Sequence, residues 1–295
     1  MPELPDVVVY VEALERHLKG HLLQRVQLLS AFVLRTVEPP VTAIHGHRVV
    51  GVHRIGKRIA LEFEGQLFAV LHLMIAGRLR WREPGQKPGM GPKMLLAAFE
   101  FDHGTLYFTE AASQKRASMQ VLHGPGALAS VGRGGIEPME ATLEEFHDAL
   151  TRESHTVKRS LTDPRLISGI GNAYSDEILH AAKLSPLKLT RTLDDGELIR
   201  LYEAMRVTLE GWTARLRDEV QDGFPEKVTA FHPQMAVHGR YGQPCPVCGT
   251  PIQRIVYAAN ECNYCARCQT GGRLLADRSL SRLLKSDWPR SIDDL

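Results

Sequence analysis

The first twenty residues have the periodicity of an amphipathic helix. Apolar residues recur at helical spacing and form one stripe: Val7, Val11, Leu14 and Leu18. Asp6 stands just before this stripe, where a helix N-cap is expected, and Gly20 follows it as a stop signal. The pattern therefore predicts a first helix between Asp6 and Gly20 with one buried face.

A different pattern runs from Arg48 to Thr109. Short segments rich in branched and aromatic residues follow one another, and turn residues such as Gly65-Gln66 and Asp102-His103-Gly104 separate them. The segments are RVVGVHR, KRIALEFE, LFAVLHLMI, GRLRWRE, MLLAAFEF and TLYFT. Such a series is typical of an antiparallel β-sandwich or barrel.

Helical spacing returns at about Glu140. Gly169 and Gly171 interrupt it, and they predict a tight turn that leads into a helix N-terminus. We expect helices at the stripe of Leu143, Phe146 and Leu150, near Leu161, between Ile167 and Leu184, between Leu198 and Trp212, and in a tail with Leu280, Leu283 and Leu284.

These changes of pattern predict an α+β protein with several domains. A chain of 295 residues is longer than a single core usually requires. We expect a β-sandwich domain over residues 1–130, a helical domain over 140–225, a cysteine-containing module over 236–272 and a tail over 273–295. A glycine-rich linker, with glycines at 124, 126, 132, 134 and 135, follows the sandwich.

The composition is that of an ordinary globular protein. Hydrophobic residues make up 43% of the chain, and the formal net charge is +2. No run of about 18 apolar residues is present to cross a membrane. The start, MPELPD, lacks the basic and then apolar pattern of a secretory signal. We therefore expect a cytoplasmic protein that does not associate with membranes.

The basic residues are unevenly distributed along the chain. Between Val41 and Leu61 there is no acidic residue, and the same holds between Lys227 and Asn260. The first of these stretches contains Arg48, Arg54, Lys57 and Arg58. A surface that follows a phosphate backbone needs such stretches, but ordinary solvated faces have them too, so charge alone leaves both interpretations open.

All five cysteines lie between positions 245 and 268, and four of them form the pattern CxxC-x16-CxxC. Two such pairs place four thiolates around one tetrahedral zinc ion. We therefore expect one structural zinc per chain, with redox or iron–sulfur roles as alternatives. Cys262 is expected to be a bystander, with competition for the place of Cys265 as the alternative. The expected ligands are Cys245, Cys248, Cys265 and Cys268.

Four features, taken together and in this order along the chain, are specific enough to indicate a protein family. They are the start Met1-Pro2-Glu3-Leu4-Pro5-Asp6, Gly56-Lys57 after a predicted strand, the turn Gly169-Ile170-Gly171-Asn172 and the cysteine pattern. In this combination the chain resembles the formamidopyrimidine-DNA glycosylase/endonuclease VIII (Fpg/Nei) family, from Met1 to about Gly272.

The resemblance implies an N-terminal helix on a β-sandwich, a helix–two-turn–helix domain and a zinc finger whose hairpin contacts DNA. It also implies that Pro2 is the Schiff-base nucleophile and that Glu3 acts at the sugar. Lys57 would donate a proton and contact a phosphate. Lys158 and Asn172 match positions that hold the DNA backbone.

The chemistry of the chain start supports this reading directly. Removal of Met1 exposes the secondary amine of Pro2, and an α-amine titrates near 7.7–8.0, against about 10.4 for lysine. More of it is therefore unprotonated and nucleophilic at neutral pH. Glu3, its neighbour, is placed to act as a general acid or base. Lys57 is an alternative nucleophile, because Arg54 and Arg58 would lower its pKa.

The sequence departs from the family pattern at several places that support the extruded nucleotide. Asn260 stands where an arginine usually grips a phosphate. Residues 111–116 replace the usual Arg-Phe wedge, and Arg116 is its candidate replacement. Met74 or Ile75 is a candidate to fill the space left by the extruded base, with an ordinary buried strand residue as the alternative. Lys93 is the nearest cation to a position where the family has histidine.

We therefore expect a base-excision-repair DNA glycosylase with abasic-site lyase activity. Its expected partner is duplex DNA with damaged bases or abasic sites, which would bring the chain to the nucleoid, and it is expected to act as a monomer. The alternatives are a catalytically weak DNA-binding protein on the same scaffold and an unrelated zinc-ribbon protein. The expected DNA contacts are Arg54, His72, Lys93, Arg116, Lys158, Asn172 and Asn260.

Overall fold

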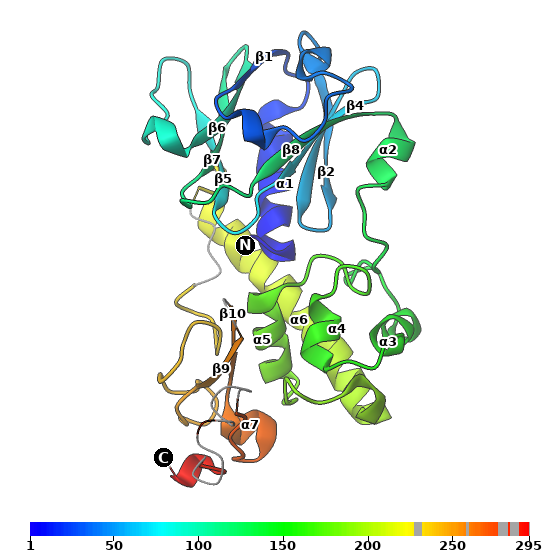
Figure 1. The fold of residues 1–295 in the computed structure, drawn as a ribbon, viewed down its shortest axis with the longest axis vertical. Coiled ribbons are helices and arrows are strands. Elements are labelled where there is room, and N and C mark those ends of the chain that lie inside the picture. Colours follow the sequence, from blue (N-terminus) through cyan, green and yellow to red (C-terminus); the bar gives the residue numbers. More distant parts are fainter. Residues whose placement is uncertain (227–231, 258–259, 277–282, 284–288, 295) are drawn as a thin grey trace. The chain divides into compact units, whose positions relative to one another are not determined.

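The computed structural model describes the chain except for residues 227–231, 258–259, 277–282, 284–288 and 295. The chain forms two compact units (Figure 1). Unit 1 comprises residues 1–133 and 212–229, and unit 2 comprises residues 134–211 and 230–295. The long helix α6 (Asp195–Val220) contributes to both units. Among the described residues, no helix is long and apolar enough to cross a membrane.

Unit 1 begins with helix α1 (Leu4–Leu18), which confirms the first predicted helix. Its start differs in detail, because the N-cap is Glu3 and Asp6 lies in the first turn. The backbone N–H of Glu3 donates to the Asp6 carboxylate at 2.8 Å, as in a capping box. The helix ends where Gly20 adopts a φ of 83°. Three members of the predicted stripe, Val7, Leu14 and Leu18, are fully buried, and Val11 is partly buried.

Two antiparallel four-stranded sheets form the rest of unit 1. One has the order β1-β6-β7-β5 and the other β2-β3-β4-β8. Their inner faces share one core with α1, which packs on β2 (Figure 1). The predicted β-sandwich is therefore present. The strands are β1 (Leu23–Leu28), β2 (Val49–Ile55), β3 (Arg58–Phe63), β4 (Leu67–His72), β5 (Gly77–Arg82), β6 (Leu95–Phe101), β7 (Gly104–Glu110) and β8 (Ser118–His123).

Short elements occupy the connections of unit 1. The segment expected to be a glycine-rich linker contains helix α2 (Pro125–Ala129), which starts after Gly124. The described part of the unit also contains the 3₁₀ turns η1 (Ala31–Val33), η2 (Val41–Ile44) and η3 (Pro92–Met94).

Unit 2 is mainly helical and carries a β-hairpin at its end. Helix α5 starts at Asn172, with Gly171 as its N-cap and Gly169 at a φ of 80°, so the predicted turn is present. The helix expected between Ile167 and Leu184 is therefore shorter than predicted. The remaining elements are α3 (Leu143–Thr151), α4 (Val157–Thr162), α5 (Asn172–Ala181), η4 (Thr190–Thr192), β9 (Gln253–Tyr257), β10 (Asn260–Tyr264), α7 (Ala266–Thr270) and η6 (Ile292–Asp294).

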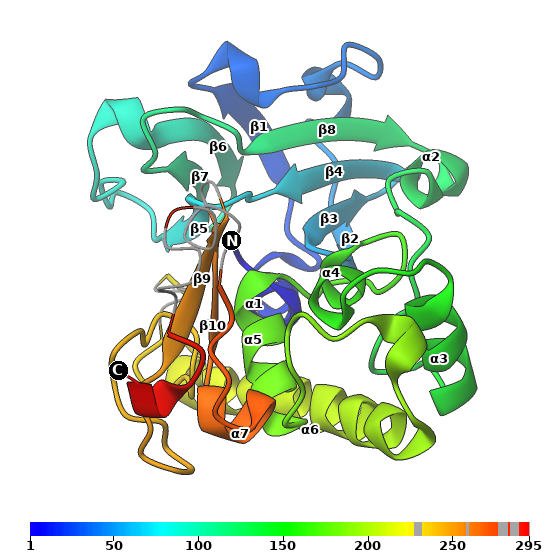
Figure 2. The ribbon, with the colours of Figure 1, turned by 60° about the horizontal axis from the view of Figure 1, so that its bottom comes forward.

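The hairpin of β9 and β10 lies beside α5, and α7 contacts the same helix (Figure 2). The two strands pair antiparallel, with Asn260 opposite Tyr257. The helix expected around Leu280 and Leu284 lies outside the described residues.

The connection between β4 and β5 has little room for an added side chain, and this generates a first prediction. A Cβ atom at Gly77 would lie 2.2 Å from the carbonyl oxygen of Leu73. We expect Gly77→Ala to destabilise unit 1 by about 1–3 kcal/mol, since the backbone must shift. Gly126→Ala in α2 is the matched control, because nothing lies within 4 Å of its added Cβ. The two variants are compared by thermal unfolding, monitored by circular dichroism. Equal unfolding midpoints for the two variants would contradict the packing argument.

Candidate functional site

The chain start is buried among charged groups of unit 1. Pro2 is buried, and Glu3 is 3% exposed. Burial lowers the pKa of the α-amine of Met1, the residue before Pro2. The carboxylates of Glu3 and Asp6 oppose this shift, whereas the cations of Arg78 and Lys57 reinforce it. An amine in this environment is more often unprotonated at neutral pH than a free one.

Lys57 lies in the turn between β2 and β3, where Gly56 adopts a φ of 59°. Burial lowers the pKa of Lys57, and the nearby Glu3 carboxylate partly offsets the shift. The structure thus places Lys57 within electrostatic reach of Glu3 and of the chain start, although they come from two separate segments. Arg78 on β5 joins them, and the sequence analysis did not single it out.

Cationic side chains gather at one end of the β2-β3-β4-β8 sheet. Strand register places Arg58 opposite His72, and His72 opposite Ser118. Arg54 lies opposite Ile59, one register position away, so its side chain projects from the other face of the sheet. Burial, followed by the charges of Arg58, Lys57 and Arg133, lowers the pKa of His72 to about 4. His72 is therefore neutral at neutral pH, and any contact it makes to an anion is a hydrogen bond.

The β4–β5 turn presents the two apolar candidates, Met74 and Ile75. The N–H of Gly77 closes the turn by donating to the carbonyl of Leu73 at 2.9 Å. Met74 adopts a φ of 53°, and Ile75 at the tip is 59% exposed. The guanidinium of Arg78 donates to the carbonyls of Ile75 and Gly77, at 3.2 and 2.7 Å. Ile75 is therefore an exposed residue on a braced turn.

A buried carboxylate organises the loop that carries Arg116. Glu110 is 1% exposed, and its carboxylate accepts from the backbone N–H groups of Arg116 and Ala117, at 2.9 and 3.1 Å. The Arg116 side chain is exposed and donates to Gln114. Lys93 is also exposed, in η3. Glu110 is a second residue that the sequence analysis missed.

In unit 2, Lys158 and Asn172 hold the turn before α5. The Lys158 ammonium donates to Asp176 at 2.5 Å, to Ser175 at 2.9 Å and to the carbonyl of Asn172 at 3.3 Å. The Asn172 amide donates to the carbonyl of Glu261 on β10 at 2.8 Å. Both residues thus have structural partners, and their contact with DNA stays a prediction. The side chain of Asn260 lies outside the described part of the chain.

Two adjacent acids on α5, Asp176 and Glu177, fasten the hairpin and the segment before it. Asp176 accepts from His238 Nδ1 at 2.8 Å and from the N–H of Asn263 at 3.1 Å. Glu177 accepts three backbone N–H groups at 2.7, 2.9 and 3.0 Å, from residues 236–238. Burial raises the pKa of Glu177, and these hydrogen bonds oppose the shift. The sequence analysis did not identify either acid.

The four expected zinc ligands converge in unit 2. Their Sγ atoms all lie within 4.8 Å of one another, with Cys245 and Cys268 3.9 Å apart and Cys248 and Cys265 3.4 Å apart. Zinc–sulfur bonds of about 2.3 Å in a tetrahedron separate the sulfurs by roughly 3.8 Å. The donor set and its spacing therefore fit a structural zinc ion.

The surroundings of the four thiols agree with this assignment. Gly249, directly after the first pair, adopts a φ of 74°, as a tight turn requires. His180 Nε2 lies 3.3 Å from Cys245 Sγ, next to the ligand shell. Cys262 lies instead in an apolar cluster with Ile255 and Tyr264.

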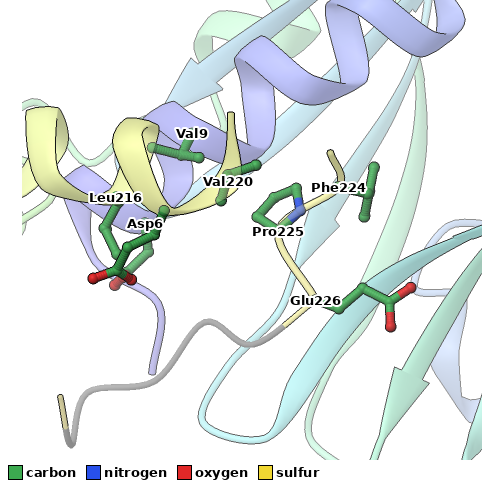
Figure 3. Close-up of a pocket in the computed structure, with 8 residues that line it drawn as sticks. Asp6, Val9, Leu216, Val220, Phe224, Pro225 and Glu226 are labelled. Carbon is green, nitrogen blue, oxygen red and sulfur yellow. The ribbon is translucent and has the colours of Figure 1, made fainter. Parts of the chain in front are cut away.

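A cavity of about 270 Å³ borders the first turn of α1 (Figure 3). Val9, Leu216 and Phe224 form much of its apolar wall, and Asp6 and Glu226 are among its acids. Burial raises the pKa of Asp6 to about 7. Glu226 is paired with Arg80 at 3.0 Å and also contacts Arg82.

Comparison with known proteins gives matches along most of the chain. Residues 1–115 match the formamidopyrimidine-DNA glycosylase N-terminal domain, and residues 135–215 match the H2TH domain of the same proteins. Residues 242–271 match a zinc finger found in FPG and IleRS. The formamidopyrimidine-DNA glycosylase of Desulforamulus reducens is 34% identical over 286 residues, which are 91% of this chain and 99% of that protein.

Solved structures give a consistent picture. The MutM (Fpg) protein from Thermus thermophilus is 30% identical, with a TM-score of 0.75, and the match covers 91% of this chain and 98% of that one. The Lactococcus lactis Fpg, solved in complex with DNA containing an abasic site, has a TM-score of 0.80 at 22% identity. That match covers 91% of this chain and 99% of the Lactococcus protein, and it supports the fold.

The cysteine geometry predicts which thiols hold zinc. Cys265→Ser removes a ligand and should lose most of the metal, because three remaining thiolates leave the tetrahedron incomplete. Cys262→Ser, the matched control, should keep one zinc per chain. The zinc content of the purified proteins, measured by mass spectrometry, distinguishes the two. The ligand assignment would be wrong if Cys262→Ser lost zinc and Cys265→Ser retained it.

The raised pKa of Asp6 predicts a pH-dependent stability. Between the ordinary value of 3.8 and about 7, the native state holds a proton that the unfolded state has released. The stabilisation is therefore fully present at the acidic end of this window and is lost as the pH rises through about 7. Asp6→Asn keeps an acceptor for the Glu3 N–H but cannot ionise.

The thermal midpoint of Asp6→Asn, taken relative to the wild type, should consequently rise between about pH 5 and about pH 8. Circular dichroism melts at a series of pH values measure this difference. A difference that stays constant across the series would show that Asp6 does not titrate in this range.

Proposed function

The chain belongs to the formamidopyrimidine-DNA glycosylase family, and we propose on that basis that it is a base-excision-repair DNA glycosylase with abasic-site lyase activity. The family matches extend over the sandwich, the helical segment and the zinc finger. The structural observation that supports the proposal most is the burial of Pro2 and Glu3 at the chain start, within electrostatic reach of Lys57.

We infer that the substrate is duplex DNA with damaged bases or abasic sites. The Lactococcus lactis relative was solved with DNA containing an abasic site. In this chain, the charges of Lys57, Arg58 and Arg133 act on neutral His72 at one end of a sheet. Such a group suits contact with phosphates, which dominate the affinity of proteins for DNA.

The proposed nucleophile is the secondary amine of Pro2, after removal of Met1. Its nitrogen attacks C1′ of the damaged nucleotide, and the base leaves with the bonding electron pair. The nitrogen then loses its proton, and the C1′–O4′ bond breaks with its electron pair and a proton going to O4′. The opened sugar is thereby joined to the protein through an iminium. The iminium acidifies the C2′ hydrogen, and loss of that proton expels the 3′ phosphate by β-elimination. A secondary amine forms this cation without losing a further proton.

We propose that Glu3 and Lys57 assist the reaction through opposite charges. Glu3 is buried beside the amine, where a carboxylate can stabilise the developing positive charge or transfer a proton. Lys57, whose pKa is lowered by burial, is suited to donate a proton to the departing group or to neutralise a phosphate.

We propose that residues of the β4–β5 turn and of the β7–β8 loop support the DNA around the extruded nucleotide. Ile75 is exposed at the tip of a turn that Arg78 braces, so it suits insertion into the space left by the base. Arg116 is held by Glu110 through its backbone, and its side chain stays exposed. An enzyme that acts on a base of duplex DNA extrudes that nucleotide into a pocket, and Ile75 and Arg116 would support the DNA around the gap.

The nucleophile assignment is tested by borohydride trapping on DNA that carries one abasic site. Mass spectrometry should show that the mature protein begins at Pro2. Borohydride should trap this protein in a covalent complex with the DNA. Pro2→Gly keeps an N-terminal amine of primary type, so trapping and strand cleavage should slow by at least tenfold while DNA affinity changes little.

A variant with one residue added before Pro2 separates this nucleophile from Lys57. The added residue converts the amine to an amide and leaves Lys57 intact, so trapping should be abolished. Trapping at the wild-type rate by the extended protein would exclude Pro2. Cleavage of a panel of damaged bases by the wild type tests the glycosylase step itself, and binding without cleavage would favour a DNA-binding protein on this scaffold.

A further inference from the structure

Unit 1 contains a second group of metal-binding side chains, far along the chain from the cysteines. His21 follows α1, and Asp102 and His103 form the turn between β6 and β7. We propose that these three residues bind a divalent transition-metal ion such as Zn²⁺, through both imidazoles and the carboxylate.

The donor atoms already have the spacing of a coordination shell. The Nδ1 atoms of His21 and His103 lie 3.0 and 2.8 Å from the same Asp102 carboxylate oxygen. The two imidazole rings are stacked, with centroids 3.5 Å apart. Tetrahedral zinc ligands bonded at about 2.1 Å lie roughly 3.4 Å apart, so these donors would separate by about half an ångström on binding the ion. A metal ion would therefore fit with only small movements of the side chains.

The hydrogen bonds of His103 explain why a cation suits this place. Its Nε2 lies 2.7 Å from the carbonyl oxygen of His17, which can only accept, so Nε2 carries a hydrogen. In the neutral ring Nδ1 then presents a lone pair to the Asp102 carboxylate, which also only accepts. This repulsion is relieved when either a proton or a metal ion binds at Nδ1, and the outer hydrogen bond to His17 orients the ring as metal-bound histidines require.

The site is accessible and has a fixed wall. Trp81 packs against His103, with ring centroids 4.9 Å apart. His21 and His103 line a cavity of about 260 Å³ together with His17, Glu83 and Asp222. Three protein ligands leave positions open for water on that side. Imidazole nitrogens favour zinc, copper or nickel over magnesium and calcium, which favour oxygen.

The test uses full-length protein whose cysteine site is loaded with zinc. Zn²⁺ is titrated into it calorimetrically, and we expect one additional ion per chain. His103→Ala and Asp102→Asn should each raise the dissociation constant of that ion at least tenfold. His53→Ala is the matched control, because it removes another exposed histidine that pairs with an acid, Glu62 at 2.5 Å. It should leave the second ion in place.

The wild type should also melt at a higher temperature in excess Zn²⁺, and this rise should vanish in His103→Ala, whose own fold is checked by circular dichroism. Failure of the wild type to bind a second ion would overturn the proposal, and so would unchanged binding in His103→Ala. A second ion lost equally in His53→Ala would also overturn it, because binding would then be diffuse. None of these measurements depends on glycosylase activity.

Discussion

Burial of the first turn of α1 is the constraint on which the candidate site depends. Two acids, Glu3 and Asp6, are almost inaccessible to solvent, although burying charge is costly unless partners are present. The Glu3 N–H satisfies one Asp6 oxygen, and the cations of Arg78 and Lys57 supply opposite charge nearby. The fold thus keeps an amine, acids and cations in one poorly hydrated region, where pKa values move and electrostatic interactions are strong.

Unit 2 uses the same principle for a different purpose. Its buried acids, Asp176 and Glu177, accept hydrogen bonds from backbone and side-chain donors of the zinc-finger segment. Lys158 balances the charge of Asp176. A small zinc module has little core of its own, so fixed polar contacts to α5 help to set its orientation on that helix.

The sequence predicted those features whose cause is local. The period of the first helix, the glycines of the turn before α5 and the spacing of the cysteines each act within a few residues. Strands β1 and β8 were missed because their short segments, Leu23–Leu28 and Ser118–His123, mix polar and apolar residues and gain their place only by pairing with distant strands.

The same limit applies within the candidate site. Pro2, Glu3 and Lys57 were identified through a family resemblance, whereas Arg78 and Glu110 were not. Arg78 braces the β4–β5 turn by donating hydrogen bonds to its carbonyls, and Glu110 holds the β7–β8 loop by accepting hydrogen bonds from its backbone N–H groups. Neither contact leaves a pattern in the sequence, because the sequence around an arginine or a glutamate does not show which distant backbone groups its side chain contacts. The hydrogen bond between His238 and Asp176 likewise joins residues that are 62 positions apart in the sequence, so no local pattern predicts it.

Unit 1 is assembled from two distant parts of the chain, and this affects the order of events during synthesis. Leu216, Phe224 and Glu226 line the same cavity as Asp6, so the surroundings of the first turn are complete only once residue 226 has left the ribosome. Until then the N-terminus lacks part of its cover. On the proposed role of Pro2, the removal of Met1 that exposes its amine would therefore compete in time with the folding that encloses the chain start.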